Sequence, residues 1–223
     1  MSTATSALSP VPGTRLPVMT EDPRPRRSED TVARIVAAAR QCFARKGVDR
    51  TRMEDIAAAA GMTRQNVYRY ASGRDELVEL ALVECTREFA IILRDKLDPD
   101  LCDVRGSFID QLSAAVLMGR ESAEFVALTG ALPRLQLNLL VGGPDVHIAV
   151  RDSFGPLLKR ARLADMLRTD VSEDEMIEWL QGVLTFLAPR PDLVGQRLRR
   201  MIDKFVASGV LKPCVDKYGE LTP

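Results

Sequence analysis

The stretch TRMEDIAAAAGMTRQNVYRY, residues 51–70, contains two short helical segments separated by one glycine. Thr51 and Glu54 have the spacing of a capping box, which predicts that Thr51 caps the first helix. Gly61 supplies the left-handed conformation that commonly ends a helix, and Thr63 is expected to cap the second one. Two short helices joined by a tight glycine turn are the pattern of a helix-turn-helix.

The second of these helices carries polar side chains where a packed helix would carry apolar ones. Val67, Tyr70 and Ala71 fall on its inward side at i, i+3 and i+4, whereas the opposite side is polar and aromatic. Arg and Gln side chains can form bidentate hydrogen bonds with guanine and adenine edges in the major groove of DNA. We therefore expect DNA contacts from Arg64 and Gln65 as base readers, with Thr51, Arg52, Thr63, Asn66, Tyr68, Arg69, Tyr70 and Arg74 around them.

The charge of this part of the chain favours the same interpretation. Residues 24–75 hold 12 Lys and Arg against 6 Asp and Glu, although the net charge of the whole chain is zero. A basic N-terminal part on an acidic remainder is expected where one end of a protein meets a polyanion. The alternative is a helix pair that packs into a bundle and leaves these side chains as an ordinary solvent-exposed face.

The preceding residues complete the N-terminal part. Residues 1–27 contain five prolines and no hydrophobic periodicity, so we expect a flexible arm. Its basic end, Arg24, Arg26 and Arg27, is expected either to touch DNA or to stay in solvent. From Ser28 to Gly47 apolar residues recur at steps of three and four, which predicts a helix.

The run GVDRTRMEDIAAAAGMTRQNVYRYASGRDELVELAL, residues 47–82, resembles the DNA-binding signature of the TetR family of transcriptional regulators. Two positions depart from the family pattern, since Ala71 stands where Phe is usual and Tyr70 where His is frequent. The resemblance covers about residues 28–85. The residues that match the pattern are Thr51, Ile56, Ala57, Ala60, Gly61, Tyr68, Arg74 and Leu77.

The resemblance implies a repressor that binds a near-palindromic DNA operator as a homodimer and is released by a small effector. It implies a helix-turn-helix domain over residues 28–75 and a larger effector-binding and dimerisation domain over residues 76–212, followed by a tail, 213–223. The alternative is a DNA-binding regulator that is controlled by a protein partner and has no small effector.

The part of the chain after residue 76 has helical periodicity throughout. A long helix is expected to about Lys96, and no alternating strand pattern competes with helix, so the expected fold class is all-α. Breaks are expected at Pro99, at 142–144 and at 189–191. The further helices are expected over about 104–119, 121–131, 133–141, 145–163, 173–187 and 191–208.

The larger domain is expected to carry two functional surfaces. Candidate effector contacts are mostly apolar with a few polar groups, which suits a mostly apolar ligand: Phe108, Gln111, Leu112, Phe125, Leu128, Thr129, Arg134, Asn138, His147 and Trp179. The helix over 173–187 is apolar nearly all round, so one side is expected to meet a second subunit, with full burial in one subunit as the alternative. The candidate dimer contacts are Ile177, Leu180, Leu184, Leu198, Met201 and Phe205.

No enzyme, cofactor or metal site is expected. The sequence has no G-x-S-x-G motif, P-loop or Gly-rich dinucleotide turn, and its only histidine is His147. The four cysteines are isolated from one another, and Cys42 and Cys85 are expected in the core. With no charge-free apolar run of about 18 residues and no signal peptide, a cytoplasmic location is expected.

Overall fold

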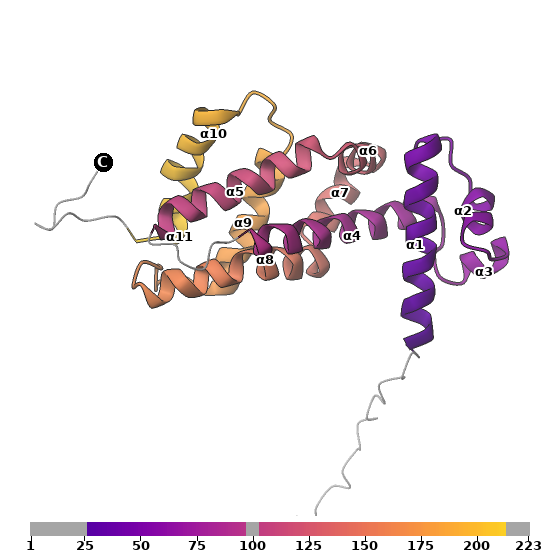
Figure 1. The fold of residues 1–223 in the computed structure, drawn as a ribbon, viewed down its shortest axis with the longest axis horizontal. Helices are drawn as coiled ribbons and strands as arrows, with labels where there is room; N and C mark the ends of the chain where they lie inside the picture. Colours follow the sequence, from indigo (N-terminus) through magenta and orange to yellow (C-terminus); the bar gives the residue numbers. More distant parts are fainter. Residues whose placement is uncertain (1–25, 97–102, 213–223) are drawn as a thin grey trace, which may run out of the picture.

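The computed structural model describes residues 26–96 and 103–212 (Figure 1). Three helices at one end, α1 (Arg26–Lys46), α2 (Met53–Ala59) and α3 (Arg64–Tyr68), form what we call the head. Helix α4 (Arg74–Asp95) runs from the head into the body. The body contains α5 (Val104–Glu121), α6 (Ala123–Ala131), α7 (Arg134–Val141), α8 (Pro144–Leu163), α9 (Glu173–Leu187), α10 (Gly195–Met201), the π-helix η1 (Ile202–Ala207) and α11 (Ser208–Val210).

The all-α prediction is confirmed. Within the described ranges the β-type pairing is one isolated antiparallel bridge, between Leu167 and Leu211. The helices predicted over 145–163 and 173–187 occur almost residue for residue as α8 and α9. The one predicted from 191 begins later, at Gly195, because Val194 before it is extended; Leu193 is buried at 1% exposure.

The start of α2 differs from the prediction. Its N-cap is Arg52, whose backbone N–H donates to Oδ2 of Asp55 at 3.0 Å, so the carboxylate that caps the helix is not that of Glu54. Thr51 is 3% exposed, and its hydroxyl donates to the carbonyl oxygen of Gly47 at 2.8 Å. The prediction that Thr51 caps α2 is therefore wrong, because its hydroxyl closes the loop after α1.

The core of the head includes side chains from the body. Ile35 of α1, Ile56 of α2 and Val67 of α3 are 0–1% exposed and belong to one buried cluster. Leu128 of α6 and Leu132 after it lie in the same cluster, at 1% and 7% exposure. Helix α6 therefore packs against the head although it is far from it in sequence.

Two of the four cysteines lie in the described residues, and the prediction that Cys42 and Cys85 are buried is confirmed. Burial raises the pKa of the Cys85 thiol to about 12, and the nearby Glu124 carboxylate adds to this. The thiol therefore stays protonated and acts as a small apolar side chain. Cys102 and Cys214 lie outside the described residues.

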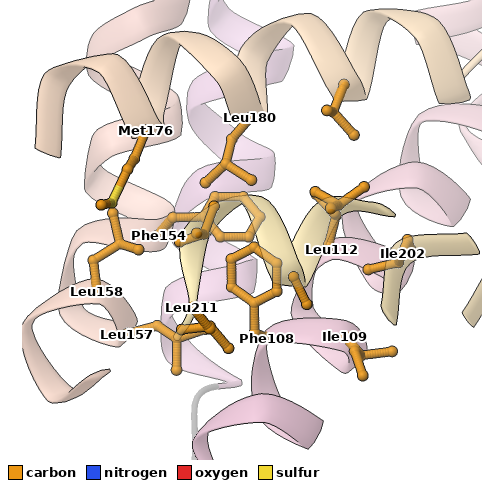
Figure 2. Packing of buried hydrophobic residues seen from close by; sticks show 14 of the residues in the cluster. Phe108, Ile109, Leu112, Phe154, Leu157, Leu158, Met176, Leu180, Ile202 and Leu211 are labelled. Carbon is orange, nitrogen blue, oxygen red and sulfur yellow. The ribbon is translucent and has the colours of Figure 1, made fainter. Parts of the chain in front are cut away.

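The body has its own core, built around two aromatic rings (Figure 2). The ring centroids of Phe108 on α5 and Phe154 on α8 are 6.3 Å apart, with the rings tilted. In Figure 2 Leu180 lies above the two rings, and Leu112 and Ile202 lie to one side of them. Because α9 contributes Leu180 from its inward side, α9 is an integral part of the body core.

Three side chains that we expected at a dimer contact are part of this core. Ile177, Leu180 and Leu198 are 0%, 0% and 1% exposed within one chain. They have no surface to offer a second subunit, which corrects the expectation at these positions. Leu184 and Met201 are partly buried against the core, whereas Phe205 is 72% exposed.

Candidate nucleic-acid interface

Helix α3 begins where the sequence predicts. Thr63 is its N-cap, and the hydroxyl oxygen accepts from the N–H of Asn66 at 3.3 Å. Gly61 in the preceding turn has a φ of +64°, in the left-handed region that favours glycine. Val67, which is fully buried, fixes the inward side of the helix. A cap, a turn and one buried side chain thus set the direction of this short helix.

Five of the ten side chains predicted to contact DNA lie on the outer side of α3. Gln65, Asn66 and Arg69 are exposed, and Tyr68 is 41% exposed. Tyr70 differs, since it lies beyond the end of α3 and packs, partly buried, against the head core. Ala71 beside it is 2% exposed, so both residues turn toward the cluster. Tyr70 is therefore a packing residue and not part of the outer side.

An open groove with a volume of about 510 Å³ lies between α3 and the starts of α2 and α4. The start of α4 faces this groove, and the N-terminus of a long helix attracts anions. Three arginines and three carboxylates line the groove, so charge of both signs faces the same space. Its lining residues are Thr51, Arg52, Met53, Glu54, Arg64, Tyr68, Ser72, Gly73, Arg74, Asp75 and Glu76.

Arg64 is held by partners on both α2 and α3. Its Nη1 atom is 2.6 Å from Oε1 of Glu54, and its Nη2 atom donates to the hydroxyl of Tyr68 at 3.2 Å. The guanidinium carbon lies 5.3 Å from the centroid of the Tyr68 ring. The hydrogen bond to Tyr68 and the charge of Glu54 raise the pKa of Arg64, which stays positively charged. Glu54 was not among the predicted DNA-contact residues. It lies on α2 and Arg64 on α3, and helical periodicity within one helix does not predict contacts with the next helix.

Arg74 joins the loop after α1 to the start of α4. Its Nη1 atom donates to the carbonyl oxygen of Asp49 at 3.3 Å, while the side chain remains about one-third exposed in the groove. Ser72, just before α4, donates from its N–H and its hydroxyl to Oε2 of Glu76 at 2.6 and 2.7 Å. Thr51 also borders the groove, but its hydroxyl is occupied by Gly47. Arg52, Arg64 and Arg74 are thus the arginines that line this groove.

The candidate effector residues fall into separate groups. Phe108, Gln111 and Leu112 are buried together in the body on α5. Phe125 and Leu128 of α6 pack instead against the head core. The structure therefore does not gather the expected contacts into a single pocket.

Thr129, Asn138, His147 and Trp179 lie at or near the surface. Asn138 is exposed, and Nε2 of His147 is 2.9 Å from Nη2 of Arg151. Trp179 is 51% exposed on the outer side of α9, away from the core side chains of that helix, which corrects its assignment to an internal pocket. Thr129 donates its hydroxyl to the α6 backbone, while the side chain of Arg134 lies outside the described part of the chain.

Comparison with known proteins assigns the chain to a family. The model of the bacterial regulatory proteins of the tetR family matches residues 35–81. The chain is also 37% identical over 201 residues to a probable HTH-type transcriptional regulator, ArpR, of Pseudomonas putida, with 82% of this chain and 91% of ArpR covered. The chain belongs to the TetR family. This TetR-family regulator is also 25% identical over 198 residues to the HTH-type transcriptional regulator TtgR, again of P. putida, with 82% and 91% covered.

Solved structures show the same fold at low sequence identity. A RolR complex with resorcinol has a TM-score of 0.60 and 18% identity, with 83% of this chain and 89% of that chain covered. The TetR family repressor AlkX of Dietzia sp. has a TM-score of 0.55 and 15% identity, with 80% and 96% covered. The family match and the two P. putida relatives confirm the prediction of a DNA-binding transcriptional regulator with a helix-turn-helix. Both P. putida relatives are named as regulators and not as enzymes.

Membrane spans and metal clusters are both absent from the described residues. No helix there is both long and apolar enough to cross a bilayer. No group of three or more His, Cys, Asp or Glu side chains in this part of the chain is placed to hold a metal ion.

Proposed function

We propose that this regulator is a repressor that binds a near-palindromic operator as a homodimer and leaves it when a small, mostly apolar effector binds the body. The observation that carries the DNA part is the outer side of α3, where Gln65, Asn66 and Arg69 are exposed beside the groove. A helix with such side chains suits the major groove of B-DNA. Arg64 and Gln65 read base edges, whereas Arg52 and Arg74 hold phosphates.

A homodimer is supported by an apolar surface on the far part of the body. Trp179 and Phe186 on α9 are 51% and 55% exposed, and Phe205 on η1 is 72% exposed. The indole Nε1 of Trp179 lies over Gly209 of α11, where an added Cβ would be 3.3 Å from it, so α9 and α11 adjoin. Exposed aromatic side chains in one region mark interaction sites. A symmetric contact through this surface would bring the same aromatic residues together from both subunits.

An effector in the body is supported by polar groups inside an apolar core. Gln111 on α5 is 7% exposed, and its Nε2 donates to the backbone carbonyl of Ser153 on α8 at 2.6 Å. Phe108, Leu112 and Phe154 surround this region with apolar surface. Side chains of this kind would suit an apolar ligand with one or two hydrogen-bonding groups better than a sugar or a nucleotide, whose polar groups would lose water without enough partners. The solved structure of RolR, similar in fold, holds resorcinol.

The DNA-binding part is tested by selecting operators for the full chain from a random DNA library. Arg64→Ala and Gln65→Ala should each weaken binding of the protein to the selected operator by about 1–3 kcal/mol and relax the sequence preference of the protein. Arg94→Ala is the matched control, because Arg94 is an exposed cation at the other end of α4. Unchanged affinity and preference in both head variants would contradict the assignment.

The effector is tested by screening apolar metabolites for thermal stabilisation of the full chain and retesting hits for operator release. Linkage predicts that the effector lowers the affinity for operator by the same factor by which operator lowers the affinity for effector, on the order of 5- to 150-fold. Release by strongly hydrophilic compounds alone would contradict an apolar effector. Operator binding that no compound changes would favour control by a protein partner.

A further inference from the structure

One ion cluster joins the head, α4 and α6. Arg40 of α1 is 2.7 Å from Oε1 of Glu124 through its Nε atom and 3.0 Å from Oε2 through Nη2. On its other side, Nη1 is 2.6 Å from Oε1 of Glu88 on α4, and Nη2 is 2.8 Å from Oε2. A single guanidinium therefore holds two carboxylates, each in a bidentate pair, from two different helices.

This pairing of one side chain with two carboxylates requires an arginine. The planar guanidinium matches two carboxylates at once, which a lysine ammonium cannot do. The side chain of Arg40 is 21% exposed, so water screens these contacts only partly. Without the cation, Glu88 and Glu124 would face each other as like charges across the α4–α6 contact.

Helix α6 is placed to transmit a movement of the body. It follows α5 after a single residue, Ser122, and α5 carries the buried Gln111 of the body. Next to Glu124, the ring of Phe125 is 5.4 Å from that of Phe89 on α4. Leu128, further along, lies in the head core. Figure 1 shows α6 beside α1, at the head end of α5.

We propose that Arg40 is a positioning residue for operator recognition: by pairing with Glu88 and Glu124 it fixes the head against α4 and α6 in the orientation that fits an operator. Arg40 does not line the groove, and these two hydrogen-bonding partners lie on α4 and α6 instead of α3. It acts on DNA through the position of the head alone. A body ligand that shifts α6 would release operator by opening the Arg40–Glu124 pair. The proposal rests on the operator binding proposed above and does not require the effector to be known.

The test is a double-mutant cycle on operator affinity, with the selected operator and the full chain. Arg40→Gln, Glu124→Gln and the double variant are compared with the unaltered protein by fluorescence anisotropy, at a temperature where all four are folded. Each single variant should weaken binding about tenfold, and the double variant should be no weaker than the singles, because neighbours in one ion network are not additive. Long-range charge alone predicts opposite effects, since Arg40→Gln removes a positive and Glu124→Gln a negative charge.

A second readout separates positioning from a purely structural role. In operators with one base pair inserted between the half-sites, the distance between the two half-sites is larger by about 3.4 Å. The unaltered protein should reject these operators, whereas Arg40→Gln should discriminate against them several-fold less, because its heads are held less firmly. Arg87→Gln is the matched control: like Arg40, Arg87 pairs with a carboxylate of a distant helix, but it lies on α4 and its distant partner is Asp145 of α8, at 2.7 Å, instead of a residue of α6. It should leave affinity and spacing preference unchanged.

The outcomes are distinct. Weakening by both single variants, a non-additive cycle and a flatter spacing preference support the proposal. The proposal for Arg40 is overturned if the two single variants change operator affinity in opposite directions or additively, if either binds more tightly, or if the spacing preference is unaltered. None of these results contradicts operator binding itself. A protein that selects no operator at all would instead overturn the proposed function, and with it this inference.

Discussion

Glu54 of α2 and Arg64 of α3 form an ion pair of 2.6 Å across the turn that separates their helices. The carboxylate and the guanidinium both line the groove at which DNA is proposed to bind. Arg64 is thus kept from pointing freely into solvent. If Arg64 reads a base in the major groove as proposed, this pair has to loosen on binding, and the Glu54 carboxylate would then face DNA phosphates.

Glu54→Gln is therefore expected to tighten operator binding. Both side chains are more than half exposed, so the lost ion pair contributes little, and the removed carboxylate no longer repels phosphate. We expect affinity to rise by about two- to tenfold, and less so at high salt because the effect is electrostatic. Anisotropy titrations over a salt series measure this. Asp152→Asn, which neutralises an exposed carboxylate of the body, should show no such rise, and weaker binding by Glu54→Gln would mean that positioning Arg64 outweighs repulsion.

The cap of α3 gives a second prediction. Thr63→Ala removes the oxygen that accepts from the N–H of Asn66, and a lost N-cap costs about 1 kcal/mol, within a range of about 0.5–2 kcal/mol. Urea unfolding followed by circular dichroism measures the loss. Thr63→Ser keeps the oxygen and should stay close to the unaltered protein. Equal stability of Thr63→Ala and Thr63→Ser would show that the cap contributes nothing.

The Arg40 cluster gives a prediction for the pH dependence of stability. The hydrogen bond from Arg40 lowers the pKa of Glu124 below its usual value of 4.5. A lowered pKa stabilises the fold above the unfolded-state value, and this part is lost as pH falls through the folded-state pKa. Arg40→Gln should thus lower the free energy of unfolding by about 1–3 kcal/mol at pH 7. The difference from the unaltered protein should shrink below pH 4.5 in denaturant titrations, and a difference that grows in acid would exclude this cause.

The proposed dimer surface is tested at Phe205. An unpaired charge buried at an interface costs several kcal/mol, so Phe205→Glu should yield folded monomers by sedimentation. Because the side chain is 72% exposed within one chain, the fold of the monomer should tolerate the change. Ile148→Glu, at an apolar residue of α8 that is 50% exposed, is the matched control and should keep the oligomeric state. A Phe205→Glu dimer would place the interface elsewhere.

Local sequence signals predicted the helix-turn-helix well. Thr63 caps α3, Gly61 adopts the left-handed turn and Val67 faces inward, because each of these depends on residues within one turn of helix. Thr51 shows the limit of such signals. A threonine before an apolar run suits a cap, but here a nearer bond to Gly47 takes its hydroxyl.

Contacts between helices that are distant in the chain could not be predicted from the sequence. Helix α9 is apolar on both sides, and periodicity does not tell which side a neighbouring helix covers. In the structure the aliphatic side chains Ile177 and Leu180 are buried in the core, and the larger side chains Trp179 and Phe186 are exposed. Arg40 was missed for the same reason, since its partners lie 48 and 84 residues away. The division of the chain at residue 75 stays a prediction.

Leu128 and Leu132 restrict how this protein can be recombined with its relatives. Both lie in the buried cluster of the head although they follow α5 in the chain. A fragment ending at residue 75 would lose these leucines together with the α4 side chains of the same cluster, and the exposed apolar surface would make it prone to aggregate. A chimera that takes its operator specificity from another TetR-family member should therefore exchange only the exposed residues of α3, or else carry α4 and α6 along with the head.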